Sequence, residues 1–227
     1  MDAHIEFYDS IDSTNAELMR RAKAGNAHVG DAVAAYSQSA GRGRRGNSFS
    51  SERGGVYFSF VAENSPGALT TVKAGVAVAK ALEEYGFSPE IKWVNDVLID
   101  GKKVCGILAE AVALTSLCVV GIGINLRADA LPEELRKIAA ALDGYGTPPD
   151  AAELAERVID NFFKTGTDGL IGEYKKYMTM LGKKVMLKQT GKVVTAADVT
   201  PLGELVVTCD DGSAAVLNSG EVSVIRI

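Results

Sequence analysis

Histidine and cysteine are scarce in this sequence. Its 227 residues include 2 His and 3 Cys. The cysteines, Cys105, Cys118 and Cys209, are odd in number and widely spaced, and none belongs to a Cys-x-x-Cys pair. This pattern excludes a disulfide framework or a zinc site of that type and indicates a reducing compartment. Both histidines, His4 and His28, lie near the N-terminus, which excludes a His-rich metal centre.

A surplus of positive charge is also missing. The chain has 24 Lys and Arg against 29 Asp and Glu, a net charge of −5. Binding of nucleic acid over the whole surface is therefore excluded, and any basic site is local. The sequence has no run of roughly 18 apolar residues and no basic, apolar leader at its start. We expect a cytoplasmic protein without a membrane partner.

What the sequence does contain is typical of a globular chain. Hydrophobic residues make up 47% and charged residues 23%, and there are 6 prolines. This composition supports a sizeable core and does not fit disordered, collagen-like or coiled-coil proteins. The length allows one large domain, or one domain with a small addition.

Apolar spacing predicts a mixed α/β region over residues 1–181. Helices are expected after the capping residue Ser13, from Leu69 to about Gly86, and over residues 132–142, 151–164 and 169–180. Strands are expected over residues 5–8, 32–36, 56–61, 91–94, 97–99, 104–111 and 117–124.

The character of the sequence changes after Leu181-Gly182. Short β-type runs separated by glycine-containing turns follow, at residues 185–187, 193–199, 204–209, 214–217 and 222–227. This pattern predicts a small C-terminal β-barrel domain over residues 182–227, packed on the first domain.

The segment from Gln38 to Gly46 is rich in both glycine and arginine. Gly41, Gly43 and Gly46 alternate with Arg42, Arg44 and Arg45. Glycine lets a backbone approach a ligand, and guanidinium groups bind anions with bidentate geometry. We expect an anion site, although a mobile surface loop or an RNA-binding arginine tract stays open. The segment is neither a Walker loop nor a dinucleotide-binding fingerprint.

A second polar segment interrupts the predicted strands. Lys92, Asn95 and Asp96 flank Trp93-Val94, and buried strands seldom carry such residues together unless they face a cleft. The pair Asp100-Gly101 predicts a hairpin that brings Asp96 close to Lys103 on the adjacent strand. The two side chains form either a base and a cation in one site or a plain cross-strand salt bridge.

The ordered set of these motifs resembles the biotin protein ligases. The resemblance covers nearly the whole chain. Its segments are Asp12-Ser13-Thr14-Asn15, Gln38 with Gly41-Arg42-Gly43-Arg44-Arg45-Gly46, Lys92-Trp93-Val94-Asn95-Asp96, Lys103 with Gly106-Ile107-Leu108-Ala109-Glu110, Gly121-Ile122-Gly123-Ile124-Asn125 and Gly220-Glu221-Val222-Ser223-Val224.

The resemblance implies a fold: a mixed-sheet catalytic domain related to class II aminoacyl-tRNA synthetases, followed by a small Src-homology-type barrel. Two positions depart from the family pattern, with Val94 at a usual Pro and Phe49 at a usual Trp, and both replacements keep an apolar group. The motifs begin at residue 12. We therefore expect the monofunctional type, which lacks a DNA-binding domain and does not bind DNA.

The implied activity has two steps. Biotin is activated by ATP, with Mg²⁺ on the phosphates, to give biotinyl-5'-AMP. The biotinyl group then passes to a lysine of a biotin carboxyl carrier protein domain. A homodimer is left open.

The resemblance also assigns residues. Catalytic roles fall to Lys103, Arg44 and Asp96, where Asp96 either accepts the proton of the attacking amine or orients a neighbour. Biotin-binding roles fall to Ser13, Thr14, Asn15, Gln38, Gly41, Arg42, Trp93, Lys103 and Gly106. ATP-binding and adenylate-binding roles fall to Arg42, Arg44, Arg45, Phe49, Lys92, Asn95 and Asn125. No protein side chain is assigned to a metal.

Two other functions compete with this interpretation. A lipoate–protein ligase shares the fold and reaction, but it needs a long pocket without partners for a ureido ring, so Ser13, Thr14 and Gln38 argue against it. An RNA-binding protein would use Arg42, Arg44 and Arg45, and the net charge of −5 argues against that.

Overall fold

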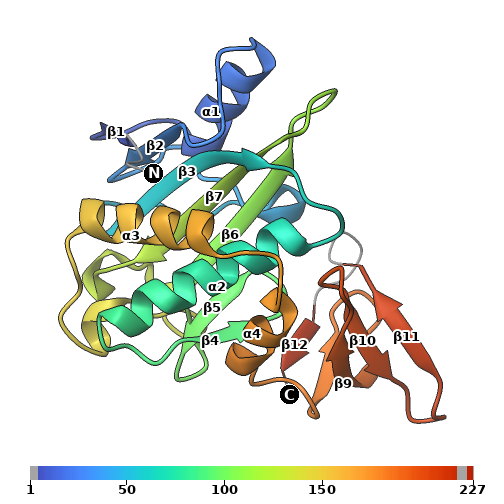
Figure 1. Cartoon of the computed structure of the whole chain (residues 1–227). Helices are drawn as coiled ribbons and strands as arrows, with labels where there is room; N and C mark the ends of the chain where they lie inside the picture. The colour runs from blue at the N-terminus through green and yellow to red at the C-terminus, as the bar shows by residue number, and fades with distance from the viewer. Residues whose placement is uncertain (1–4, 219–223, 227) are drawn as a thin grey trace.

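The computed structural model describes residues 5–218 and 224–226. Most of the motif Gly220-Glu221-Val222-Ser223-Val224, and parts of the strand predicted over residues 222–227, therefore lie outside the described residues. The described chain forms one large sheet of seven strands and one small sheet of five strands. Figure 1 shows the two sheets and the helices that cover them.

The large sheet is mixed. Its strands are β1 (Ile5–Tyr8), β2 (Ala32–Ala35), β3 (Gly55–Glu63), β4 (Glu90–Lys92), β5 (Asp96–Ile99), β6 (Lys102–Ala111) and β7 (Leu117–Asn125). They lie in the order β1-β2-β3-β7-β6-β5-β4. β1 and β2 are parallel, and every other neighbouring pair is antiparallel.

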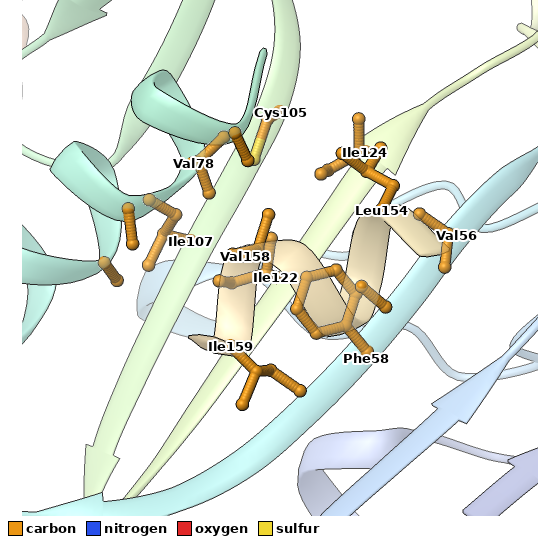
Figure 2. Close-up of a cluster of buried hydrophobic side chains, with 14 of the residues drawn as sticks. Val56, Phe58, Val78, Cys105, Ile107, Ile122, Ile124, Leu154, Val158 and Ile159 are labelled. Carbon is orange, nitrogen blue, oxygen red and sulfur yellow. The ribbon is translucent and has the colours of Figure 1, made fainter. Parts of the chain in front are cut away.

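Alternation along β3 sends side chains to two different faces. Val56, Phe58 and Phe60 belong to the main hydrophobic cluster with α2 (Leu69–Glu84) and α3 (Ala151–Lys164). Figure 2 shows this cluster, where Val78 of α2 and Leu154, Val158 and Ile159 of α3 meet the strands.

The opposite face carries α1 (Thr14–Lys23), which packs Leu18 and Ala22 against Val61 of β3 and Val119 of β7. Tyr57 and Ser59 alternate with Val56, Phe58 and Phe60 along β3 and so point to this face. The face with α1 is therefore the one on which polar side chains are held over the sheet.

The predicted strand over residues 91–94 ends early. β4 stops at Lys92, which pairs with Asp96, and Trp93, Val94 and Asn95 form the turn of the β4–β5 hairpin. The peptide bond between Trp93 and Val94 is cis. Neighbouring side chains in a tight turn point to different sides, so the side chains of Trp93 and Asn95 have different surroundings.

The prediction of a helix over residues 132–142 is wrong. The segment forms short 3-10 turns at Glu133–Leu135 and Leu142–Gly144. Its backbone groups bond to β6 instead, because Lys103 N donates to Ile138 O and Ala140 N donates to Lys103 O. The side chain of Asn125 also donates to Ala140 O. Backbone groups that bond to another segment cannot also form the hydrogen bonds of a helix.

The small sheet is antiparallel. Its strands are β8 (Lys184–Leu187), β9 (Val193–Val199), β10 (Leu205–Thr208), β11 (Ala214–Leu217) and β12 (Val224–Arg226), in the order β11-β10-β9-β8-β12. Figure 1 shows it beside α4 (Leu170–Tyr177).

Val185, Val194 and Leu205 of the small sheet belong to the same hydrophobic cluster as Val72 of α2 and Tyr174 of α4. The small sheet thus shares a core with the rest of the chain, and the division at residues 181 and 182 stays a prediction. Among the described residues, none of the helices combines the length and the apolar character needed to span a membrane.

Candidate active site

A cavity of about 210 Å³ lies on the face of the large sheet that carries α1. The start of α1, the glycine–arginine loop, the β4–β5 turn and the central strands contribute to it. It is lined by Ser13, Thr14, Asn15, Gln38, Arg42, Gly43, Arg44, Asn47, Ser48, Phe49, Ser59, Asn95, Asp96, Lys103, Gly106, Ile107, Leu108, Gly121, Ile122 and Gly123. The structure therefore brings together segments that are far apart in the sequence.

One end of the cavity is lined mainly by uncharged polar groups. Thr14 Oγ1 and Ser59 Oγ lie 2.8 Å apart, and Ser59 Oγ donates to Asn15 Oδ1 over 2.7 Å. Gln38 Oε1 accepts hydrogen bonds from Thr14 N at 2.8 Å and from Thr14 Oγ1 at 3.2 Å. This network holds several donors and acceptors in fixed positions beside a buried surface.

The first turn of α1 is placed by its cap. Ser13 has extended backbone angles, and its side chain accepts a hydrogen bond from Ala16 N. Asp12 in turn accepts a hydrogen bond from Ser13 N and forms an ion pair with Arg20 of α1. The cap begins the helix at Thr14, so Thr14 and Asn15 face the sheet and are almost fully buried.

Glycines of β6 and β7 form the floor of the cavity. A Cβ at Gly121 would lie 2.2 Å from Asn15 Oδ1. A Cβ at Gly123 or Gly106 would lie 2.6 or 2.7 Å from the ring of Phe49. Side chains at these three positions would collide with groups that shape the cavity, which explains why β6 and β7 carry glycine there.

The other end of the cavity is charged. Lys103 Nζ lies 2.6 Å from Asp96 Oδ1, and Arg44 Nη1 donates to Asn95 Oδ1 over 2.8 Å. Lys103 Nζ also lies 5.6 Å from the centre of the Phe49 ring, within the range of a cation–π contact. Both cations therefore line the cavity, and Lys103 is the one beside the aromatic ring.

The environment of Arg44 favours an anionic ligand. Burial lowers the pKa of Arg44, and the charge of neighbouring Arg45 lowers it further, while Asp96 acts in the opposite direction. A guanidinium that has lost part of its hydration and lies beside a second cation gains from an incoming anion more than an exposed one does.

The sequence predicts no role for several residues of the site, among them Asn47, Ser48 and Ser59 of the cavity lining and Glu110 beside it. Ser59 is fully buried in the apolar strand β3, and a polar residue in such a run is itself a signal. Glu110 accepts from Asn15 Nδ2 at 2.9 Å and pairs with Arg42 at 3.3 Å. Glu110 ends the motif that begins at Gly106, but only the pairing of β6 with β7 brings it beside α1.

Two predicted residues are directed away from the cavity. Trp93 is 4% exposed and belongs to the cluster under the small sheet, where its indole Nε1 donates to Gly203 O. Asn125 is buried at the end of β7 and donates to Ala140 O.

Three further predicted residues surround the cavity lining. Gly41 lies in the loop, where a Cβ would come 2.3 Å from Phe49 O. Arg45 lies in the 3-10 turn Arg44–Gly46 with a φ of 58°. Lys92 ends β4 and is half-buried. The part of the chain that the structure describes has no cluster of three or more His, Cys, Asp or Glu arranged to hold a metal ion.

Known proteins resemble this chain in both sequence and fold. The family model described as "Biotin/lipoate A/B protein ligase family" matches residues 7–125. The bifunctional ligase/repressor BirA of Bacillus subtilis is 35% identical over 193 residues, covering 79% of this chain and 56% of the relative. The biotin–[acetyl-CoA-carboxylase] ligase of Mycobacterium tuberculosis is 30% identical over 237 residues, covering 94% of this chain and 86% of the relative.

Among solved structures, the biotin protein ligase from Aquifex aeolicus in complex with biotin and ATP is similar over 99% of both chains, with a TM-score of 0.85 and 28% identity. The match to the B. subtilis protein spans only part of that longer relative. The family model, the M. tuberculosis relative and the shared fold agree, and the chain belongs to the biotin/lipoate A/B protein ligase family.

Proposed function

We propose that this chain is an ATP-dependent biotin–protein ligase. The observation that carries the proposal is the cavity with two unlike ends, hydrogen-bonding groups around Thr14 and Ser59 and cations at Arg44 and Lys103. Biotin has the matching chemistry, with a ureido ring at one end and a carboxylate at the other. The biotin–[acetyl-CoA-carboxylase] ligase named above supports the same substrate.

The ureido ring fits the uncharged end. It presents one carbonyl acceptor and two N–H donors, which need partners once they leave water. The hydroxyl groups of Thr14 and Ser59 can each donate or accept, and Asn15 Oδ1 offers an acceptor. Ser13 and Gln38 complete this end. The carboxylate then lies toward Lys103.

The first step joins two anions. A biotin carboxylate oxygen attacks the α-phosphorus of ATP, the bond to the bridging oxygen breaks, and pyrophosphate leaves. Lys103 pairs with the carboxylate and then with the charge that develops on the α-phosphoryl oxygens. Arg44, held by Asn95, neutralises the same region, and Arg42, paired with Glu110 beside Asn15, holds the loop over biotin. Exclusion of water keeps the mixed anhydride from hydrolysis.

The second step transfers the acyl group. The neutral amine of a lysine on a biotin carboxyl carrier protein domain attacks the carbonyl carbon, the bond to phosphate oxygen breaks, and AMP leaves. The amine nitrogen loses a proton, and Asp96 is the carboxylate that lines the cavity among the described residues. It accepts that proton or orients the amine through Lys103.

The nucleotide is placed beside Phe49 and the charged end of the cavity. Arg45, in the 3-10 turn of the loop, and Lys92, at the end of β4, serve the phosphates. ATP enters as its Mg²⁺ complex, with the ion carried by the phosphates. We further propose the finer fold assignments, a class II synthetase-like catalytic domain and a Src-homology-type barrel, together with a cytoplasmic setting.

A single assay tests the proposal. The chain is incubated with Mg²⁺, ATP, biotin and a biotin carboxyl carrier protein domain, and the carrier is weighed by mass spectrometry. We expect one biotinyl group on one lysine, dependent on ATP. Modification with lipoate in place of biotin would favour the lipoate ligase. Salt-dependent retention of RNA on a filter, without carrier modification, would favour the RNA-binding alternative.

A further inference from the structure

The sole tryptophan connects the small sheet to the cavity without entering it. Trp93 Nε1 donates to Gly203 O over 2.9 Å, across 110 residues of sequence. Its backbone N–H points to Met180 Sδ at 3.3 Å, and the next carbonyl, that of Val94, accepts from Tyr174 Oη at 3.2 Å. One side of the β4–β5 turn is thus held by groups outside the cavity.

The other side of the same turn holds cavity groups. Asn95 Oδ1 accepts from Arg44, and its side-chain amide donates to Ile107 O at 3.1 Å. Asp96 pairs with Lys103 at 2.6 Å. Because consecutive peptide units are planar and short, a displacement of Trp93 is passed to Asn95 within two residues.

The carbonyl that receives the indole belongs to a rigid turn at residues 200–204. Thr200 N donates to Glu204 O at 2.8 Å, and Gly203 N donates to Thr200 O at 2.9 Å. Gly203 has a φ of +81°, and a Cβ there would lie 2.9 Å from Val72 Cγ2 of α2. Ala68 N donates to Leu202 O at 2.8 Å, which seats the turn on the start of α2.

We propose that this turn of the small sheet positions the reacting groups of the cavity, with Trp93 as the positioning residue. The inference rests on the proposed function, since it assigns the small sheet a part in that reaction. Its physical basis is preorganisation: Arg44 and Lys103 stabilise developing charge only while Asn95 and Asp96 hold them in place. The small sheet therefore contributes to turnover although it supplies no residue to the lining of the cavity among the residues described.

The test compares Trp93→Phe with Asp198→Asn. Phe keeps an aromatic ring in the cluster but removes the indole N–H. Asp198→Asn breaks a different polar link to the small sheet, the 2.5 Å ion pair with Lys175 of α4, which does not lead into the cavity. For Trp93→Phe we expect kcat of biotin-dependent ATP–pyrophosphate exchange to fall on the order of tenfold, with KM for biotin nearly unchanged. Asp198→Asn should leave both constants at their original values.

If Asp198→Asn lowers kcat as much as Trp93→Phe does, at the same loss of Tm, the inference is overturned. Unchanged exchange in Trp93→Phe would overturn it as well. Gly203→Ala is the second variant, because it displaces the acceptor and keeps Trp93. It should reproduce the loss of kcat.

The fluorescence of Trp93 can be measured directly, because it is the sole tryptophan. Saturating the unmodified chain with biotin and a non-hydrolysable ATP analogue should shift its emission, since coupling is reciprocal. Unchanged emission would overturn the inference even if the variants fail to fold. Absence of exchange in the unmodified chain would overturn the proposed function, whereas full exchange in Trp93→Phe would overturn only this inference.

Discussion

Lys103 and Asp96 form an ion pair although they are not opposite each other in the β5–β6 ladder. Asp96 aligns with Gly106, and Lys103 aligns with Leu98, with a register shift between Val97 and Leu98. The Lys103 side chain extends along the strand toward Gly106, where a Cβ would lie 3.1 Å from Nζ. The bulge and the glycine together let the ammonium reach the carboxylate inside the cavity.

Replacing Lys103 should be the most damaging single change at the cavity. In Lys103→Ala the Asp96 carboxylate loses its partner and faces the incoming biotin carboxylate, so repulsion replaces attraction. We expect weaker biotin binding and a rate of pyrophosphate exchange lower on the order of 100-fold. Isothermal titration with biotin and the exchange assay measure the two effects.

Lys102 supplies the matched control. Its side chain is on the other face of β6, exposed, and reaches toward Arg136 O at 3.4 Å. Lys102→Ala should leave binding and exchange unchanged. Lys103→Arg should restore only part of the rate, because a planar guanidinium differs in shape from an ammonium. Equal losses at Lys102 and Lys103 would contradict the assigned role.

Arg44→Gly should release the adenylate. The variant removes a half-buried cation and its bond to Asn95, so the loop holds the intermediate less tightly. We expect increased acylation of an unrelated amine, measured by mass, and a smaller effect on exchange. Arg53→Gln, which loses an exposed ion pair with Asp9, is the control. Slower exchange without off-target acylation would instead assign Arg44 to the first step alone.

Two glycine-to-alanine changes should have opposite effects on stability. In Gly121→Ala the new methyl group meets Asn15 Oδ1 at 2.2 Å, which should destabilise the chain by about 1–3 kcal/mol and weaken biotin binding. In Gly172→Ala, within α4, nothing lies near the new methyl group. Its helix propensity should stabilise the chain by up to about 1 kcal/mol. Urea unfolding of both variants tests the pair, and a stable, biotin-binding Gly121→Ala would refute the proposed floor of the cavity.

Stability at acid pH should depend on Asp12. Hydrogen bonds from Arg20, and then the backbone N–H of Ser13, lower the pKa of Asp12 to about 2. Since the folded pKa is below the unfolded one, the contribution is complete above about pH 4 and is lost as the pH falls toward 2. The Tm advantage of the unmodified chain over Asp12→Asn should therefore be constant near neutral pH and shrink between about pH 4 and pH 2. Parallel Tm curves over that interval would contradict the assignment.

Local signals were sufficient where a few adjacent residues decide the structure. Ser13 caps α1 as its type and position predict. The pair Asp100-Gly101 takes positive φ values of 49° and 75° and closes the β5–β6 hairpin. Alternation of Val56, Phe58 and Phe60 correctly predicted a strand, and the structure buries both faces of it.

The same kind of signal was misleading over residues 132–142. Apolar spacing there suits a helix, but the backbone around Ile138 and Ala140 bonds to Lys103 of β6. Nothing within the segment itself indicates that partner. A competing bond from a distant strand overrode the local pattern, as tertiary context often does.

The sequence by itself determined which chemistry is available, because the motifs contain the cations, carboxylates and hydrogen-bonding groups of the cavity. Only the tertiary structure decided how they meet. Asn15 reaches Ser59 across 44 residues and Glu110 across 95 residues, because β3, β7 and β6 pair beneath α1. Trp93 turns away from the cavity because it packs in the cluster shared with the small sheet and donates to Gly203 O. Backbone preference acts over a few residues, whereas strand pairing and core packing place distant side chains together.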